Sequence, residues 1–118
     1  MKVLAFEDGF DIGALLTSSG IDMSEIELIQ RWDSTEFLEH IKDFSPDVLL
    51  LDHFIPPTKG LEVLQQLNIA VVAGEIARPG IIVGMSSASM ANERMVQFGA
   101  DHGVIKFDLP KLPIWSNN

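Results

Sequence analysis

Three short apolar runs constrain the fold of this chain more than any other feature. They are residues 3–6 (VLAF), 48–51 (VLLL) and 81–85 (IIVGM), and none contains a charged side chain. A strand with one face in water alternates apolar and polar residues, so uninterrupted apolar runs indicate strands that are buried on both faces. The runs therefore predict a parallel sheet with helices on both sides.

Weaker patterns complete this sheet. The alternating segment 26–29 predicts an edge strand, and residues 103–105 predict a short fifth strand. Apolar residues at helical spacing lie between the strands, at residues 12–16, 37–41 (after a cap at Asp33 or Ser34), 61–67 and 90–98. The alternation predicts a flavodoxin-like, doubly wound α/β fold of five parallel strands in the order 2-1-3-4-5, with functional groups at the carboxyl ends of the strands.

Composition narrows the class of protein. The 118 residues, 47% of them hydrophobic, suffice for one packed domain. A net charge of −9 argues against direct contact with nucleic acids or anionic membranes. The chain has no cysteine, and its beginning, MKVLAFED, lacks the apolar stretch of a signal peptide. We therefore expect a soluble, cytoplasmic protein.

The last residues break the strand and helix alternation. Pro110 and Pro113 lie three positions apart in the stretch LPKLPIWSNN, where they exclude a regular closing α-helix. We expect residues 1–107 to form the domain and residues 108–118 to form an irregular tail.

A tail of this kind leaves apolar surface to be covered. Ile114 and Trp115 lie within it, and a tryptophan gains stability only when its ring is buried. The two residues either fold back over the domain or dock on another copy, so a homodimer is one of the two expected outcomes.

Three carboxylates follow two of the predicted strands. Glu7 and Asp8 come directly after the first apolar run, and Asp52 comes directly after the second. In the order 2-1-3-4-5 these strands are neighbours, so the three acids should meet at one edge of the sheet. Each acid alone could be a helix cap or a solvated turn residue. Together they would repel one another unless a cation lies between them, and an oxygen-only set suits Mg²⁺.

A hydroxyl and an ammonium group are expected at the same edge. Ser86 follows the third apolar run, and Lys106 follows the predicted fifth strand. Ser86 could instead cap the next helix, with Ser87 competing for its functional role, and Lys106 could be a solvated loop lysine. The three acids opposite favour an inward-pointing ammonium.

In the order of these acidic, hydroxyl and lysine side chains and in their placement at strand ends, residues 2–107 resemble the response-regulator receiver domain of two-component signalling, of the chemotaxis-regulator type. The resemblance is carried by the pair Glu7 and Asp8, by the loop DHFIPPTKG that begins at Asp52, and by the segments GMSSAS and GADHGVIK. The resemblance implies that Asp52 accepts a phosphoryl group from phosphohistidine. It further implies a magnesium site with the following ligands: Asp8 and Asp52 directly, Glu7 through water, and the backbone carbonyl of Phe54. Ser86 and Lys106 would bind the phosphoryl oxygens.

The implied function is that of a stand-alone receiver in a phosphorelay. Its partners would be a histidine kinase or a histidine phosphotransfer protein and an unidentified output protein. It would catalyse only its own phosphorylation and dephosphorylation. The alternative is a degenerate receiver that acts as a phosphorylation-independent interaction module. That alternative is favoured by Gly103, which stands where the family often has an aromatic switch residue, and by Phe107, where the family usually has a proline. The absence of the family's closing helix favours it as well.

Phe54 bears on whether the chain is a phosphohydrolase and on how long a phosphorylated state would last. A phosphohydrolase of similar topology would need a second acid two residues after the nucleophile, and Phe54 occupies that place. Its bulk also suggests that it shields an acyl phosphate from water, which would prolong the phosphorylated state.

Overall fold

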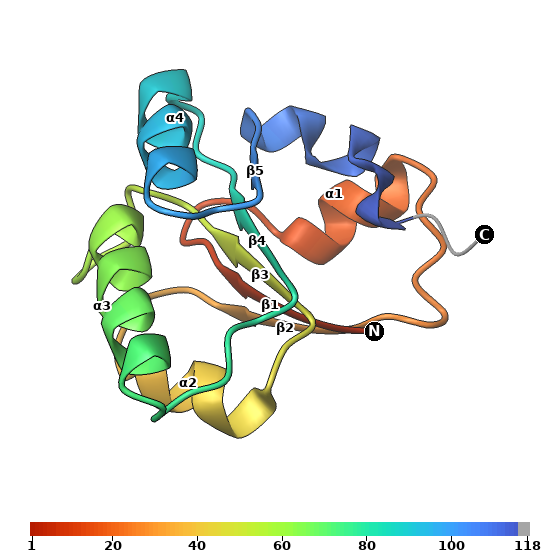
Figure 1. The fold of residues 1–118 in the computed structure, drawn as a ribbon. Helices are drawn as coiled ribbons and strands as arrows, with labels where there is room; N and C mark the ends of the chain where they lie inside the picture. The colour runs from red at the N-terminus through yellow and green to blue at the C-terminus, as the bar shows by residue number, and fades with distance from the viewer. Residues whose placement is uncertain (116–118) are drawn as a thin grey trace.

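The computed structural model, which describes residues 1–115, contains one sheet of five parallel strands (Figure 1). The strands are β1 (Lys2–Phe6), β2 (Glu27–Arg31), β3 (Val48–Leu51), β4 (Ile81–Gly84) and β5 (His102–Gly103). They pair in the order β2-β1-β3-β4-β5, with every neighbouring pair parallel. The flavodoxin-like, doubly wound topology predicted from the apolar runs is confirmed.

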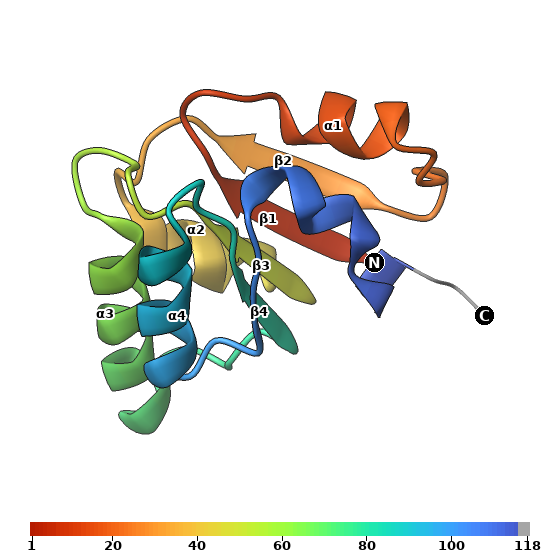
Figure 2. The same ribbon diagram turned by 90° about the horizontal axis from the view of Figure 1, so that it is seen from above.

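Helices cover both faces of the sheet. They are α1 (Ile12–Ser18), α2 (Phe37–Phe44), α3 (Gly60–Val72), α4 (Ser89–Gln97) and the 3₁₀ helices η1 (Lys106–Lys111) and η2 (Pro113–Trp115). Seen from above, α1 and the 3₁₀ helices lie on one side of the sheet, and α2, α3 and α4 lie on the other (Figure 2). Among the described residues, no helix combines the length and apolarity that a membrane crossing requires.

The alternation of side chains along each strand divides the core into two layers. Toward α2, α3 and α4 the strands contribute Leu4, Phe6, Leu49, Leu51 and Ile82. Toward α1 and the 3₁₀ helices they contribute Val3, Ala5, Val48, Leu50 and Val83. Because both faces are buried, the central strands contain apolar residues without interruption.

The 3₁₀ helices complete the second of these layers. Leu109 is fully buried and the Trp115 ring is 6% exposed, both packed in the layer that also contains α1. The indole nitrogen of Trp115 donates a hydrogen bond to the Leu109 carbonyl at 2.9 Å. Of the two expected outcomes for Trp115, folding back is therefore the one observed. Residues 116–118 of the predicted tail lie outside the described part of the chain.

The predicted cap of α2 is wrong. The helix begins after Glu36, which adopts a left-handed backbone conformation with φ of 55° and makes no side-chain cap. Ser34 is instead buried against the loop after β3, where its hydroxyl donates to the Thr58 carbonyl at 2.8 Å and accepts from the Thr58 N–H at 2.7 Å. Asp33 accepts a hydrogen bond from the N–H of Thr35 at 2.9 Å. Tertiary contacts to the loop thus outweigh the local capping preference.

Candidate functional site

Three acids meet at the carboxyl ends of β1 and β3. The backbone N–H of Asp52 donates to the Phe6 carbonyl at 3.0 Å, which places the end of β3 beside the end of β1. Glu7, Asp8 and Asp52 each offer a ligand oxygen, and these oxygens lie within 4.8 Å of one another. Glu7 and Asp52 are buried, whereas Asp8 is exposed. The predicted convergence of the three carboxylates is observed.

The carboxylate of Asp52 lies in an unfavourable electrostatic position. Burial is the largest cause that raises its pKa above the usual value of an aspartate, and the neighbouring Glu7 charge raises it further. The Lys106 ammonium and a hydrogen bond from the backbone N–H of Phe54 lower this pKa only in part. Within residues 1–115, buried Oδ1 of Asp52 has no hydrogen-bond partner. This oxygen is therefore available to a ligand that would compensate its charge.

Glu7 is held from two sides. Its Oε2 accepts hydrogen bonds from the backbone N–H groups of Gly9 and Phe10, at 2.6 and 3.0 Å. Its Oε1 lies 2.8 Å from Nζ of Lys106, whose nearest distance to an Asp52 oxygen is 4.0 Å. Lys106 is 5% exposed, so it points inward as predicted and is not a solvated loop lysine.

The end of β4 brings Ser86 to the same edge. Ser86 is fully buried, and its hydroxyl oxygen accepts a hydrogen bond from the N–H of Ala88 at 3.1 Å, which braces the turn before α4. The competing Ser87 is exposed. Burial thus distinguishes the two serines, while the binding of a phosphoryl oxygen by Ser86 stays a prediction.

Two amide side chains that sequence reasoning missed hold the loops of this edge. The Gln30 amide, on β2, donates to the carbonyls of Glu7 and Phe10, at 3.0 and 2.7 Å, and accepts from the N–H of Ile12 at 2.9 Å. Gln30 thereby fixes the whole acidic loop after β1. Nothing in the sequence indicates this role, because Gln30 directly follows the predicted strand of residues 26–29.

The Asn92 side chain fixes the loop after β4 by hydrogen bonds in a similar way. Its Oδ1 accepts from the Ser86 N–H at 2.7 Å, and its Nδ2 donates to the carbonyls of Ser86 and Val104, at 2.8 and 2.7 Å. One buried side chain of α4 therefore joins Ser86 to the segment that leads to Lys106. Nothing in the sequence distinguishes this asparagine from an exposed one.

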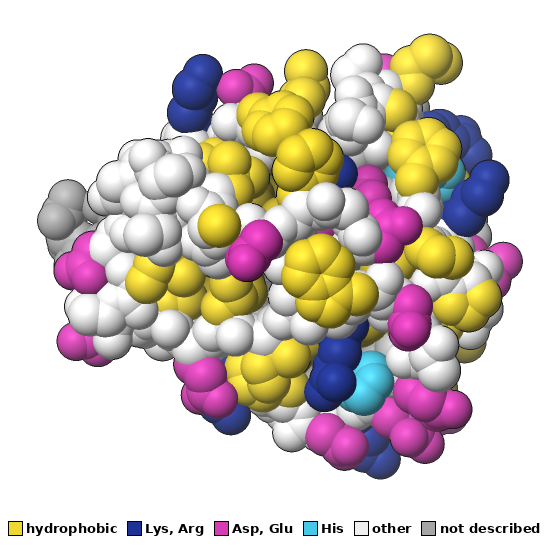
Figure 3. All heavy atoms as spheres, turned by 180° about the vertical axis from the view of Figure 1, so that it is seen from behind, with side chains coloured by type: hydrophobic (Ala, Val, Ile, Leu, Met, Phe, Trp, Pro, Cys, Tyr) yellow, Lys and Arg dark blue, Asp and Glu magenta, His cyan; other side chains and the backbone are white. Residues whose placement is uncertain are grey.

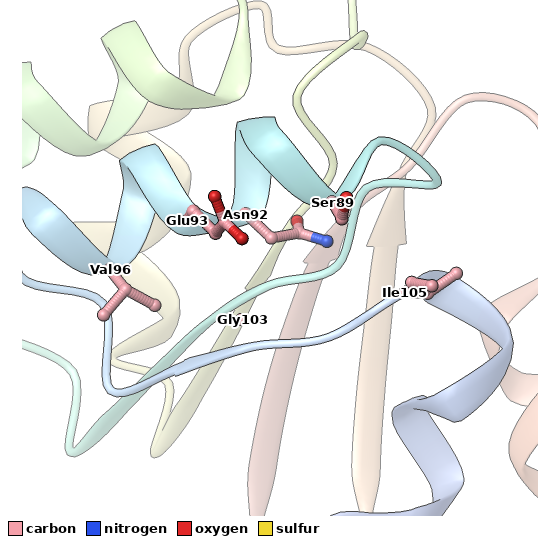
Figure 4. Close-up of a pocket in the computed structure, with 6 residues that line it drawn as sticks. All are labelled: Ser89, Asn92, Glu93, Val96, Gly103 and Ile105. Atoms are coloured by element: carbon pink, nitrogen blue, oxygen red, sulfur yellow. The ribbon is translucent and has the colours of Figure 1, made fainter.

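A surface pocket of about 290 Å³ lies between α4 and β5 (Figure 4). It is lined by Ser89, Asn92, Glu93, Val96, Gly103 and Ile105. A Cβ atom on Gly103 would lie only 3.0 Å from the Asn92 carbonyl oxygen, so glycine lets β5 approach α4 closely. As expected from the sequence, no side chain at this position can rotate to change the surface.

The loop after β3 is shaped by a second close approach. A Cβ atom on Gly60 would overlap the carbonyl group of Asp52, so only glycine fits there. Phe54 in the same loop is 55% exposed, and its ring centroid lies 5.0 Å from that of His53. The ring thus lies at the surface, and the predicted use of the Phe54 carbonyl as a metal ligand stays a prediction.

Receiver domains are among the solved structures that have a similar fold. The BeF₃-activated N-terminal receiver domain of Klebsiella pneumoniae RstA is 21% identical, with a TM-score of 0.70, covering 90% of this chain and 86% of that one. The phosphorylated cyanobacterial phytochrome response regulator RcpA is 17% identical, with a TM-score of 0.70 and coverages of 93% and 88%. The Mn²⁺-bound form of the response regulator Rcp1 is 18% identical, with a TM-score of 0.67 and the same coverages.

These comparisons define the class of fold. No protein-family model matches the sequence. At such low identities the similarity establishes the architecture alone, which is that of response-regulator receiver domains over about nine tenths of the chain.

Proposed function

We propose that this chain is a phosphoacceptor receiver domain of a two-component phosphorelay, phosphorylated on Asp52 in a Mg²⁺-dependent reaction. The observation that carries the proposal is the state of Asp52, a buried carboxylate with raised pKa and an unpartnered Oδ1, beside two acids and a buried lysine. Such a group is costly to the fold, and its presence at a strand end is explained if it reacts. We assign residues 1–107 to the receiver unit and residues 108–118 to a tail, of which Leu109 and Trp115 pack into the core layer that contains α1.

The donor set fits a magnesium ion. Glu7, Asp8 and Asp52 supply only oxygen atoms, and the free Oδ1 of Asp52 offers one of them directly. These residues, together with the Phe54 carbonyl, would hold the ion, Glu7 acting through water. A bound Mg²⁺ would supply positive charge that neutralises the phosphoryl oxygens. The manganese in Rcp1, a protein of the same fold, supports a divalent cation here.

Asp52, Lys106 and Ser86 would carry out the transfer of the phosphoryl group. An oxygen of Asp52 attacks the phosphorus of a phosphohistidine, the P–N bond breaks, and its electron pair returns to the imidazole nitrogen, which takes up a proton. The product is an acyl phosphate on Asp52. Lys106 offsets the negative charge on the transferred oxygens, and the Ser86 hydroxyl donates a hydrogen bond to one of them. The domain turns over no separate substrate, so it is a signalling module and not a conventional enzyme.

The partners follow from this chemistry. The phosphodonor is a histidine kinase or a histidine phosphotransfer protein, and an unidentified output protein reads the phosphorylated state. The net charge of −9 disfavours direct binding to nucleic acids or anionic membranes. A homodimer remains part of the proposal, with the apolar groups exposed around α3 and α4, such as Val72 and Met90, as its candidate surface.

One observation favours the alternative function. The Lys106 ammonium is already paired with Glu7 at 2.8 Å, so the ion pair could serve the fold alone. In that case the domain is a phosphorylation-independent interaction module, and Asp52 is a remnant. The two functions differ in whether Asp52 binds a phosphoryl analogue.

Beryllofluoride, which binds aspartate as an analogue of a phosphoryl group, tests this difference. Fluorine NMR of the protein with beryllium, fluoride and Mg²⁺ should show bound-fluoride signals that disappear on addition of excess EDTA. Asp52→Asn should show none, while Asp43→Asn, a change at an exposed acid in α2, should retain them. Bound signals that are missing from the wild type, despite Mg²⁺ binding measured by calorimetry, would favour the interaction module.

A further inference from the structure

One aromatic ring, that of Phe10, lies over the lysine of the candidate site, and a second ring, that of Phe107, packs against the first. The Lys106 ammonium lies 5.0 Å from the centroid of the Phe10 ring. The Phe107 ring meets Phe10 edge to face, with centroids 5.2 Å apart and an interplanar angle of 88°. A cation within about 6 Å of an aromatic face is attracted by the charge distribution of the ring. The lysine is therefore held by an aromatic ring in addition to its carboxylate partner.

The Phe10 and Phe107 rings lie at the surface and are not part of the buried core. Phe10 is 47% exposed and Phe107 is 55% exposed, whereas the Lys106 side chain beneath Phe10 is only 7% exposed. On the face shown in Figure 3, hydrophobic side chains gather beside acidic ones. Phe10 makes its contact with Lys106, and Phe107 its contact with Phe10, although about half of each side chain is exposed.

Phe10 acts on both members of the buried ion pair. Its backbone N–H donates to Oε2 of Glu7 at 3.0 Å, while its ring contacts Nζ of Lys106. Its carbonyl accepts a hydrogen bond from the Gln30 amide at 2.7 Å, which fixes the residue to β2. The orientation of the Phe10 ring is set in turn by the edge-to-face contact with Phe107.

We propose that Phe10 and Phe107 are positioning residues that hold the Lys106 ammonium between Glu7 and Asp52, aimed at the oxygens of a phosphoryl group on Asp52. The proposal rests on the proposed phosphoacceptor function. A lysine has a flexible four-carbon stem, and Glu7 is closer to its ammonium than Asp52 is, 2.8 Å against 4.0 Å. The Phe10 ring blocks one side of the ammonium, so that when the ammonium moves away from Glu7 it moves toward Asp52.

Four single variants separate this role from simple packing. Phe10→Leu keeps an apolar side chain but removes the ring, and Phe10→Tyr keeps the ring. Phe107→Leu removes the edge that orients Phe10. Trp32→Leu is the matched control, because Trp32 is 52% exposed beyond the end of β2 and has no role in the proposed site. Thermal unfolding of each variant establishes that it is folded before it is assayed.

The kinetic test uses phosphoramidate, a small donor, so that docking of a protein partner cannot contribute. With saturating Mg²⁺, Phe10→Leu should lower the maximal rate of phosphorylation about three- to tenfold, with the half-saturating phosphoramidate concentration unchanged. Phe107→Leu should lower it by about twofold. Phe10→Tyr and Trp32→Leu should keep the wild-type rate. An unchanged or increased maximal rate for Phe10→Leu overturns the proposal, as does an equal loss in Phe10→Tyr.

A second measurement does not require phosphorylation at all. In metal-free protein, the ring current of Phe10 should shift the ε-methylene protons of Lys106 upfield in ¹H–¹³C NMR spectra. The shift should persist in Phe10→Tyr and be lost in Phe10→Leu. If the wild type takes up no phosphoryl group but these shifts behave as stated, the phosphoacceptor function fails while the contact stands. If Phe10→Leu leaves the Lys106 signals where they are, the positioning role fails even in a phosphorylated protein.

Discussion

Lys106 and Glu7 form a buried ion pair, in which Nζ of the lysine lies 2.8 Å from Oε1 of the glutamate. The ammonium therefore leans away from Asp52, whose nearest oxygen is 4.0 Å distant. This asymmetry explains why burial and the Glu7 charge raise the pKa of Asp52 despite a nearby cation. A phosphoryl group on Asp52 would offer Lys106 a second anionic partner. We therefore expect phosphorylation to change the Lys106–Glu7 ion pair first.

Removal of the lysine charge should destabilise the fold. Lys106→Met keeps the aliphatic stem but leaves the fully buried Glu7 carboxylate unpaired, which should cost about 3 kcal/mol of unfolding free energy. Urea unfolding measures the change. The double variant with Glu7→Gln should recover much of the loss, and Lys111→Met, at an exposed lysine, should change stability by less than about 0.5 kcal/mol. Equal effects at the two lysines would contradict a buried ion pair.

The raised pKa of Asp52 predicts that its charge destabilises the metal-free protein. Since the pKa is higher in the folded state than the ordinary aspartate value of 3.8, ionisation favours the unfolded chain at neutral pH. Asp52→Asn should therefore raise the melting temperature at about pH 7, and the gain should shrink as the pH falls toward 3.8, below which both states of the wild type are protonated. Scanning calorimetry in EDTA over this range tests the sign. A lower melting temperature for the variant at neutral pH would show that the carboxylate is already compensated.

Asn92 should contribute more to stability than its single side chain suggests. Asn92→Ala removes three hydrogen bonds and leaves the buried N–H and C=O of Ser86 and the partly buried carbonyl of Val104 without their partner, which should cost on the order of 3 kcal/mol. Asn68→Ala is the matched control, because that amide donates one hydrogen bond, to the Phe98 carbonyl at 2.7 Å, and should cost about 1 kcal/mol. Chemical denaturation measures the loss of unfolding free energy in each variant. Similar losses in both would argue against a special role for the Asn92 hydrogen bonds that join Ser86 to Val104.

The tail should be part of the cooperative fold. Trp115→Ala removes a large, nearly buried ring from the layer that also contains α1, so it should cost about 3 kcal/mol or more. Ile69→Ala, at a side chain of α3 that is 70% exposed, is the control and should cost less than about 1 kcal/mol. If the tryptophan variant unfolds like the wild type, the tail does not cover the core in solution.

Parallel-sheet geometry makes much of this protein predictable from its sequence. Three apolar runs indicate a doubly covered sheet, and in such a sheet the residues that follow adjacent strands must meet at one edge. This is why the amino-acid order alone suffices to place Glu7, Asp8, Asp52 and Lys106 together. The observed strand order and the 4.8 Å acid cluster agree with that reasoning.

Contacts between side chains from distant loops are not predictable in the same way. The hydrogen bonds of Gln30 and Asn92, and the ring of Phe10 above Lys106, depend on how loops settle against one another and have no periodic signal. For the same reason the capping preference of Ser34 is misleading, because Thr58 offers it better partners in the folded chain. The prolines of the tail predict the loss of an α-helix but not the 3₁₀ turns that bury Trp115.

The most direct test of the phosphoacceptor proposal is intact-mass spectrometry after incubation with phosphoramidate and Mg²⁺. We predict that the wild type gains the mass of one phosphoryl group, that EDTA prevents the gain, and that Asp52→Asn gains nothing while Asp43→Asn behaves as the wild type. A wild type that binds Mg²⁺ but never gains this mass, or an Asp52→Asn variant that does, would contradict the account.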